Sequence, residues 1–368
     1  MNVQIRPATV DDNAGLIELS RCSPMRGVLT AYSDRTPNFF ALSSLQGKDS
    51  WTFAALDRDR IIGCFSCIGR TVKYAGRAVR ELYAGDLKVL PSARRGRVAA
   101  ELARRVVKTA ESEGFDIVVS EVMGNNTAAL KVLQWTSENV VSAQSAGVIH
   151  NMALLPYRRY SLIKGYDINP GQAEDVGPIA ALLRRTYSNY NHRPSFGEEA
   201  FRQQLSQHPS FSVRDFLVAR RQGRIVACAG FWDQHPIRRT VVLEFNWKGE
   251  LLRQAIRFAR QFMSLGSPPA SGKPLQTQYM RFPACLPGHI EGLSALIRHK
   301  LENARHQRKF HFIWAGFHES DPLQECLRDV WRTGVDVSLF TAAIGDRLPH
   351  LAPEGPTGRA CYVDQSLI

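Results

Sequence analysis

The sequence predicts an α/β (α+β) protein built from two tandem halves, each a mixed sheet flanked by helices. Three observations indicate this fold. The length of 368 residues favours more than one domain. Segments of the first half recur in the same order in the second half. Within each half, strand patterns alternate with helix patterns, which suits a sheet with helices on both faces.

The internal repeat has three parts. Residues 5–12 and 168–175 share an offset of 163, and each places acidic residues in the expected first turn of a helix, where carboxylates favour the positive end of the dipole. Residues 60–64 correspond to 224–228, after hairpin turns at 57–59 and 221–223. Residues 115–119 correspond to 310–314 at an offset of 195, so the second copy holds about 30 extra residues, which we place partly in the loop 266–274. We predict one domain over 1–157 and a second, degenerate one over 158–368.

Composition and charge disfavour a nucleic-acid-binding protein and a membrane-spanning protein. The formal net charge of +13 indicates attraction to anions, which a phosphate-bearing co-substrate explains as well as nucleic acid does. Nucleic acid is disfavoured as a partner because the basic residues are dispersed and have no interleaved aromatic platform. No apolar run reaches the roughly 18 residues of a membrane span, and the N-terminus lacks signal-peptide order, so we expect a cytoplasmic protein without a membrane partner.

Cysteine and histidine spacing gives no metal or disulfide pattern. The seven cysteines are scattered, and the single CxxC of Cys64 and Cys67 stands inside an apparent strand. A zinc site needs a second ligand pair, so we interpret both as core cysteines and expect no metal.

The segment that carries chemistry is residues 82–99. An apolar strand runs to Pro91, and a short basic turn then opens a helix with Val98, Leu102, Val106 and Ala110 on one face and Gly114 as its cap. Such a turn directs unpaired backbone amides at one point, which makes an anion-binding site, although a basic surface turn has the same sequence features.

This segment resembles the acyl-CoA loop of the GNAT (Gcn5-related N-acetyltransferase) superfamily. Val89, Pro91, Arg94 and Ala99 match the family pattern, whereas Arg97 stands where a central glycine is usual. Downstream, Asn126 and Ala129 resemble the family's Asn-x-x-Ala helix start. The resemblance covers about residues 3–140 and survives in the second half only as the repeat. It implies tandem GNAT-like domains with mostly antiparallel sheets.

The resemblance implies acetyl-CoA, or another acyl-CoA, as co-substrate on the first half, and we interpret the second half as structural or substrate-shaping. The residues expected to bind the co-substrate are Leu87, Val89, Arg94, Arg95, Gly96, Arg97, Val98, Ala99, Asn126 and Ala129.

The implied reaction is direct transfer of an acyl group to an amine, which must lose a proton to a general base. The candidates are Glu81, Asp86 and Glu121, each of which could instead be a surface or capping carboxylate. A backbone amide of the strand at 87–89 would stabilise the oxyanion. The family's usual tyrosine position holds Leu133, with Tyr83 as a candidate substitute for that proton donor.

We therefore predict an N-acyltransferase, and specifically an acetyltransferase, for a small-molecule or peptide amine. The alternative is a non-catalytic acyl-CoA-binding or regulatory protein with the same fold, because the loop is degenerate and the tyrosine is absent. We expect the acceptor between the N-terminal sheet and the interdomain surface. The sequence leaves the oligomeric state open.

Overall fold

The computed structural model describes residues 3–47, 49–94, 97–124, 126–261, 266–345 and 359–367. The first half contains the strands β1 (Val3–Pro7), β2 (Leu29–Asp34), β3 (Asp49–Asp57), β4 (Arg60–Tyr74), β5 (Arg77–Val89), β6 (Ile117–Met123) and β7 (Ala143–Leu154). Its helices are α1 (Asn13–Arg21), α2 (Ala41–Ser44), α3 (Val98–Ser112) and α4 (Thr127–Asn139), with 3-10 turns η1 (Val10–Asp12) and η2 (Pro91–Ala93).

The second half has a similar set of strands and helices. Its strands are β8 (Asp167–Pro170), β9 (Phe216–Arg221), β10 (Arg224–Trp232), β11 (Arg239–Phe245), β12 (Thr277–Cys285), β13 (Phe312–His318) and β14 (Arg332–Ala343). Its helices are α5 (Val176–Thr186), α6 (Glu198–Gln207), α7 (Trp247–Ala259) and α8 (Ile290–Gln307), with 3-10 turns η3 (Ala173–Asp175), η4 (Val213–Asp215), η5 (Pro322–Leu327) and η7 (Gln365–Leu367).

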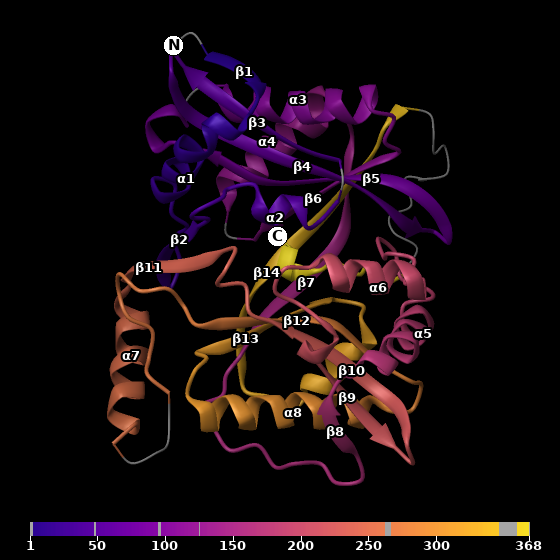
Figure 1. Cartoon of the computed structure of the whole chain (residues 1–368). Coiled ribbons are helices and arrows are strands. Elements are labelled where there is room, and N and C mark those ends of the chain that lie inside the picture. The colour runs from indigo at the N-terminus through magenta and orange to yellow at the C-terminus, as the bar shows by residue number, and fades with distance from the viewer. Residues whose placement is uncertain are drawn as a thin grey trace.

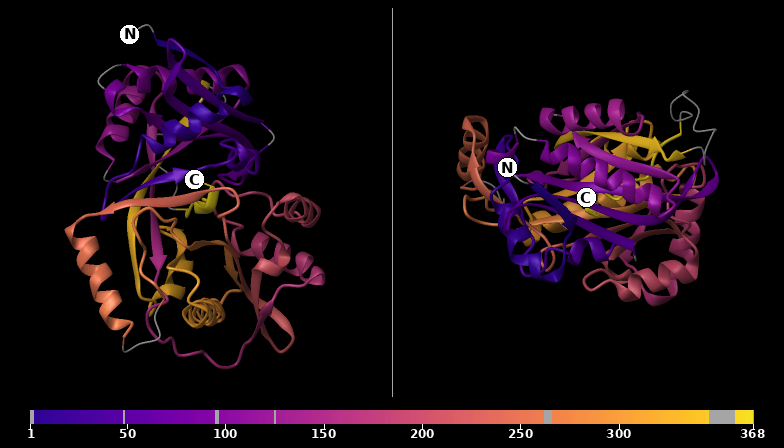
Figure 2. Two further views of the ribbon diagram at one scale, coloured as in Figure 1. Left: turned by 60° about the vertical axis from the view of Figure 1, so that its left-hand side comes forward. Right: turned by 90° about the horizontal axis from the view of Figure 1, so that it is seen from above.

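The two halves share one continuous sheet. Over the described residues it has twelve strands in the order β1-β3-β4-β5-β6-β14-β7-β13-β12-β10-β9-β8. The pairs β5–β6 and β12–β13 are parallel, and the other pairs are antiparallel. The sheet is therefore mixed and mostly antiparallel, as predicted, and the halves lie one above the other (Figure 1, Figure 2).

The repeated segments form equivalent strands. They are β1 and β8 at the two sheet edges, β4 and β10, and the parallel-paired β6 and β13. The predicted hairpin turns are present, with left-handed Arg58 in the first and left-handed Gln222 and Gly223 in the second. Helix α1 packs on β4 and β5, and α5 packs on β10 and β12. The extra residues of the second half include not only the expected loop but also β11 and α7, which lie at the side of the molecule (Figure 1).

Helix α3 forms where the spacing of apolar residues predicts it. Val98, Leu102, Val106 and Ala110 are all buried at a spacing of four, as predicted, and Gly114 adopts a φ of +74° beyond the helix end. The helix approaches β4 closely at Gly63, where an added Cβ would lie 3.2 Å from Val98 Cγ1. This contact fixes the start of α3 directly beside the end of β5.

The central strands are exchanged between the halves. Strand β14, from the second half, pairs with both β6 and β7, while β7, from the first half, pairs with β13. One apolar cluster accordingly joins Ile68, Tyr83 and Val119 of the first half to Val337 and Leu339 of β14. A division of the chain at the predicted boundary near residue 157 would therefore leave each segment with a strand that pairs with strands of the other segment.

Because β14 covers the edge of β6, the segment 1–157 expressed alone should not fold cooperatively. We expect a broad urea transition by circular dichroism for 1–157, and a single sharp transition when 1–157 and 158–368 are co-expressed and purified as a complex. A sharp transition for 1–157 alone would show that the exchanged strand is dispensable for folding.

Candidate active site

Strands β5 and β6 separate after a short parallel pairing. The pairing runs from Glu81–Ile117 to Ala84–Ser120, whereas β5 continues to Val89 and β6 continues to Met123 alongside β14. Strand β5 is buried from Glu81 to Ala84 and becomes half-buried over residues 85–88. At this point its register with β4 shifts, and Asp86 adopts a φ of +64°. The resulting bulge presents backbone amides at the point of separation.

The end of β5 leads into a basic turn and the N-terminus of α3. Arg94 is exposed, and its Nε donates a 3.1 Å hydrogen bond to the carbonyl oxygen of Val89. Arg97 is the exposed N-cap of α3 and makes no side-chain capping bond, so the first amides of the helix remain available to an anion. Arg95 and Gly96, also predicted to bind the co-substrate, lie outside the described residues.

The other predicted co-substrate residues lie on both sides of this opening. Leu87 is half-buried against the core of the first half, and Val98 is buried, with the half-buried Ala99 beside it. After β6, Asn126 Oδ1 accepts a 3.1 Å hydrogen bond from the amide of Ala129 and so caps α4. The Asn-x-x-Ala pattern therefore has a direct structural purpose at the start of this helix.

Glu81 is fully buried and has two basic partners. Its Oε1 lies 2.6 Å from Arg70 Nε, and its Oε2 lies 2.5 Å from His192 Nδ1. Burial opposes ionisation, but the charges and hydrogen bonds of Arg70 and His192 outweigh it and lower the pKa of Glu81 to about 2. A carboxylate so placed joins β5 to the second half and is a poor proton acceptor at neutral pH.

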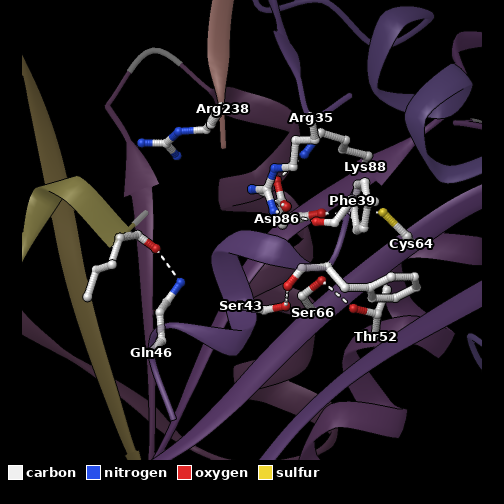
Figure 3. Close-up of polar contacts among 12 residues, drawn as sticks. Arg35, Phe39, Ser43, Gln46, Thr52, Cys64, Ser66, Asp86, Lys88 and Arg238 are labelled. Atoms are coloured by element: carbon white, nitrogen blue, oxygen red, sulfur yellow. Dashed lines mark hydrogen bonds and ion pairs between the residues drawn. The ribbon is translucent and has the colours of Figure 1, made fainter. Parts of the chain in front are cut away.

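Asp86 is held by two cations of the first half (Figure 3). Arg35, buried just after β2, places Nη2 2.6 Å from Asp86 Oδ2, and Lys88 contacts the other carboxylate oxygen. Burial acts to raise the pKa of Asp86, but the charges of Arg35 and Lys88 hold it well below its usual value. This ion cluster fixes the bulge of β5. The charge of Arg238, from the second half, also lowers the pKa of Asp86.

Glu121 differs from the other two carboxylates. It is the first residue of β6 beyond the parallel pairing, and it makes no ion pair among the described residues. Its Oε2 accepts a 3.0 Å hydrogen bond from Gln365 Nε2, whereas its Oε1 is shielded from solvent without a hydrogen-bond partner in the described part of the chain. Burial raises the pKa of Glu121 to about 7, with Gln365 and Arg70 acting in the opposite direction. Of the three predicted carboxylates, this one has the acid strength of a general base at neutral pH.

Tyr83 belongs to the same buried apolar cluster as Val119. A Cβ added at Gly85 would lie 3.2 Å from its hydroxyl oxygen, so the hydroxyl lies beside the first residue of β5 past the pairing. Burial raises the pKa of Tyr83 well above its ordinary value, which keeps the hydroxyl protonated. Leu133, at the family's usual tyrosine position, is a half-buried residue of α4.

The second half has the same backbone opening, but its own chain fills it. Strands β12 and β13 pair only from Thr277–Phe312 to Tyr279–Trp314 before they separate. Phe282, with a φ of +52°, takes the place of Asp86 at the bulge. The C-terminal segment, residues 359–367, lies against both strands, and Tyr362 stacks on the ring of Phe282 at 6.1 Å between ring centroids. The segment also lies between the two halves (Figure 1).

Several residues of the site could not be found from sequence spacing. Arg35, Arg70, His192 and Gln365 reach the three carboxylates from other elements, and Gln365 is 244 residues from Glu121. Cys64 and Cys67 are buried free thiols of β4, as predicted. Among the described residues no group of His, Cys, Asp and Glu side chains could hold a metal, and no helix has the length and hydropathy that a membrane span requires.

Comparisons with known proteins bear on the family and the fold of the chain. Residues 15–134 match the model of the acetyltransferase (GNAT) family. No curated protein sequence matches the chain. The three solved structures described below are only 12–13% identical to this chain in sequence, so they bear on the fold alone.

Three solved structures illustrate the shared fold. Saccharomyces cerevisiae N-myristoyltransferase with bound myristoyl-CoA has a TM-score of 0.60 at 12% identity, over 92% of this chain and 82% of that one. A tandem GNAT protein from the clavulanic acid biosynthesis pathway has a TM-score of 0.59 at 12% identity, over 94% and 99%. A GCN5-related glucosamine N-acetyltransferase region of a fungal multi-domain GH3 β-N-acetylglucosaminidase has a TM-score of 0.60 at 13% identity, over 92% of this chain but only 38% of that protein.

Glu81 is ion-paired and, among the residues that the structure describes, Glu121 is not, so we expect a Glu→Gln substitution to change the free energy of unfolding in opposite directions at the two positions. Glu81→Gln leaves Arg70 and His192 without their buried anion and should lower the free energy of unfolding by about 3–5 kcal/mol. Glu121, with its pKa raised from 4.5 to about 7, costs stability as pH rises between those values. Glu121→Gln should therefore raise stability at pH 8, on the order of 1–2 kcal/mol. Urea unfolding of both variants at pH 8 measures this, and equal losses would contradict the assignment.

Proposed function

Because the chain belongs to the GNAT superfamily and has the fold of its tandem members, we propose that it is an acyl-CoA-dependent N-acyltransferase. We propose acetyl-CoA as the acyl donor and a small-molecule or peptide amine as the acceptor. The observation that carries this proposal is the position of Glu121. It combines a pKa of about 7 with an unpartnered oxygen at the point where β5 and β6 separate.

The residues at the opening fit an acyl-CoA. The pyrophosphate would bind at the N-terminus of α3, where backbone amides and the exposed side chains of Arg94 and Arg97 meet. The pantetheine arm would take the place of a strand along the half-buried residues 85–88 of β5. The second half, whose equivalent opening holds Tyr362 and its neighbours, would bind no CoA.

Each step of the transfer has a candidate group. Glu121 accepts a proton from the acceptor ammonium, and the freed amine nitrogen attacks the thioester carbonyl carbon. An amide of the strand at 87–89 stabilises the resulting oxyanion. Collapse breaks the carbon–sulfur bond and releases the thiolate, to which Tyr83 can donate its hydroxyl proton. The nitrogen gives its second proton to the Tyr83 oxygen, which restores the hydroxyl, and Glu121 returns its proton to solvent when the products leave. The products are an amide and CoA, without a covalent enzyme intermediate.

The proposed donor site predicts one acetyl-CoA per chain. In calorimetric titration, wild-type protein should bind with a stoichiometry of one, and Arg94→Glu should weaken binding at least about tenfold by replacing a cation with an anion. Arg184→Glu, an exposed arginine of α5, is the matched control and should bind normally. Two sites per chain would show that the second half binds CoA, and no binding would exclude the enzyme.

The proposed base predicts a pH dependence. Since Glu121 must be ionised, kcat/KM in a free-thiol assay with an amine library should rise with pH and level off above about pH 7. Glu121→Gln should lower kcat by about 10²–10⁴-fold and remove this ionisation, with acetyl-CoA affinity unchanged. Glu138→Gln, an exposed carboxylate of α4, controls for charge. A Glu121→Gln variant with wild-type turnover would contradict the role.

A protein that binds acetyl-CoA but acetylates no amine would support the regulatory alternative. The replacement of the usual tyrosine by Leu133 is the observation that favours this second function. The two functions differ in turnover, not in donor affinity.

A further inference from the structure

The hydrogen bond from Gln365 to Glu121 joins the last residues of the chain to the candidate base. Gln365 Nε2 donates to Glu121 Oε2 at 3.0 Å, so that oxygen is occupied and Oε1 is the one left for a substrate proton. The other residues that act on the charge of Glu121 are Arg70 and Glu81, and it in turn acts on Tyr83. Arg70 and Glu81 are already paired with each other at 2.6 Å. Gln365 is therefore the neutral donor that sets the orientation of this carboxylate.

Gln365 is itself held in place by close packing. It is 8% exposed, and its side chain lies directly over Gly316 of β13. A Cβ added at Gly316 would lie 2.2 Å from Gln365 Cγ, so only glycine permits this approach. The absence of a side chain on β13 thus allows Gln365 to cross the second half and reach β6.

The segment that carries Gln365 is anchored on both sides. Asp364 pairs with the buried Arg281 of β12 at 2.7 Å. The carbonyl oxygen of Ser366 accepts hydrogen bonds from Gln234 and Arg238, and that of Leu367 accepts one from Gln46 of the first half. These bonds connect the second half, the C-terminal segment and the first half in one chain of contacts.

We propose that Gln365 is a positioning residue for the base Glu121, and that through it the C-terminal segment, residues 359–367, completes the active site of the first half. This inference rests on the proposed function of Glu121. The C-terminal segment occupies the opening of the second half. By the same placement it brings Gln365 to Glu121 in the first half.

The direct test is Gln365→Met, which keeps the length of the side chain and removes the donor. The lost hydrogen bond favours the ionised carboxylate, so its removal should raise the pKa of Glu121. The acid limb of kcat/KM should move about half to one unit to higher pH. Activity should fall about three- to tenfold at pH 6 and approach the wild-type value at pH 9, with acetyl-CoA affinity unchanged.

Two further variants distinguish the loss of the Gln365–Glu121 contact from a non-specific loss of folding or activity. Gly316→Ala displaces the Gln365 side chain without removing it and should shift the limb in the same direction. Gln324→Met, which removes a similar amide from η5, should leave the profile unchanged. A loss of activity by the same factor at every pH, or an unshifted limb in Gln365→Met, would overturn the proposal.

The proposed function and this inference can fail separately. In a double-mutant cycle, Gln365→Met should have no further effect on kcat in the Glu121→Gln background, because it acts through that residue; an additive loss would contradict the positioning role. The titration of the Glu121 carboxyl carbon by ¹³C NMR, assigned with Glu121→Gln, needs no substrate. A raised pKa in Gln365→Met in this experiment supports the contact even where no amine is acetylated, and an unchanged pKa overturns it.

Discussion

The pairing of β14 with both β6 and β7 is the constraint on which the candidate site depends. A parallel pair that overlaps for only four residues, as β5 and β6 do, gives β6 little support beyond Ser120. Strand β14 supplies that support, because it pairs with β6 over its whole length, from Val337–Met123 to Ala343–Ile117. Strand β6 can therefore leave β5 without losing its own hydrogen-bonded partner. The separation of β5 and β6 in the first half is therefore possible because β14 of the second half pairs with β6.

Both halves have a bulge where two parallel strands separate. The side chains at the bulge determine whether the opening stays accessible, as in the first half, or is covered by the chain itself, as in the second. At the bulge of β5, Asp86 lies between two cations, and the strand beyond it stays half-buried and accessible. At the bulge of β12, Phe282 offers an aromatic face, and Tyr362 of the C-terminal segment stacks on it. Neighbouring Arg281 pairs with Asp364 of the same segment. An apolar bulge beside a buried cation favours a peptide with an aromatic and an acidic residue, which this chain itself provides.

Features set by neighbouring residues could be predicted from the sequence. The apolar face of α3, the hairpin turn at Arg58 and the helix starts after Pro7 and Pro170 each depend on local spacing and backbone preference. The family loop could be located for the same reason. Helix α7 was missed although Asn246 caps it through the amide of Gly249, and that Asn followed by apolar residues at helical spacing was the available signal.

Features set by long-range pairing could not be predicted. The sequence placed Glu81, Asp86 and Glu121 near the same strands but could not rank them, because their partners come from other elements. Nor does any local pattern indicate that β14 enters the sheet between β6 and β7, since an exchanged strand has the same alternation as any other.

Glu81 and Asp86, which form ion pairs, also affect the pKa of Glu121, the candidate base. The site gathers cations, and a cation in contact with Glu121 would lower its pKa and weaken it as a base. Arg70 is the cation that acts on Glu121, and Glu81 binds it at 2.6 Å, while Asp86 holds Arg35 and Lys88. With these charges paired, Glu121 is left with burial and one neutral amide donor, and its pKa lies near 7. Burial thus raises the pKa of the candidate base, and the pairing of Arg70 with Glu81 limits how far that cation can lower it again.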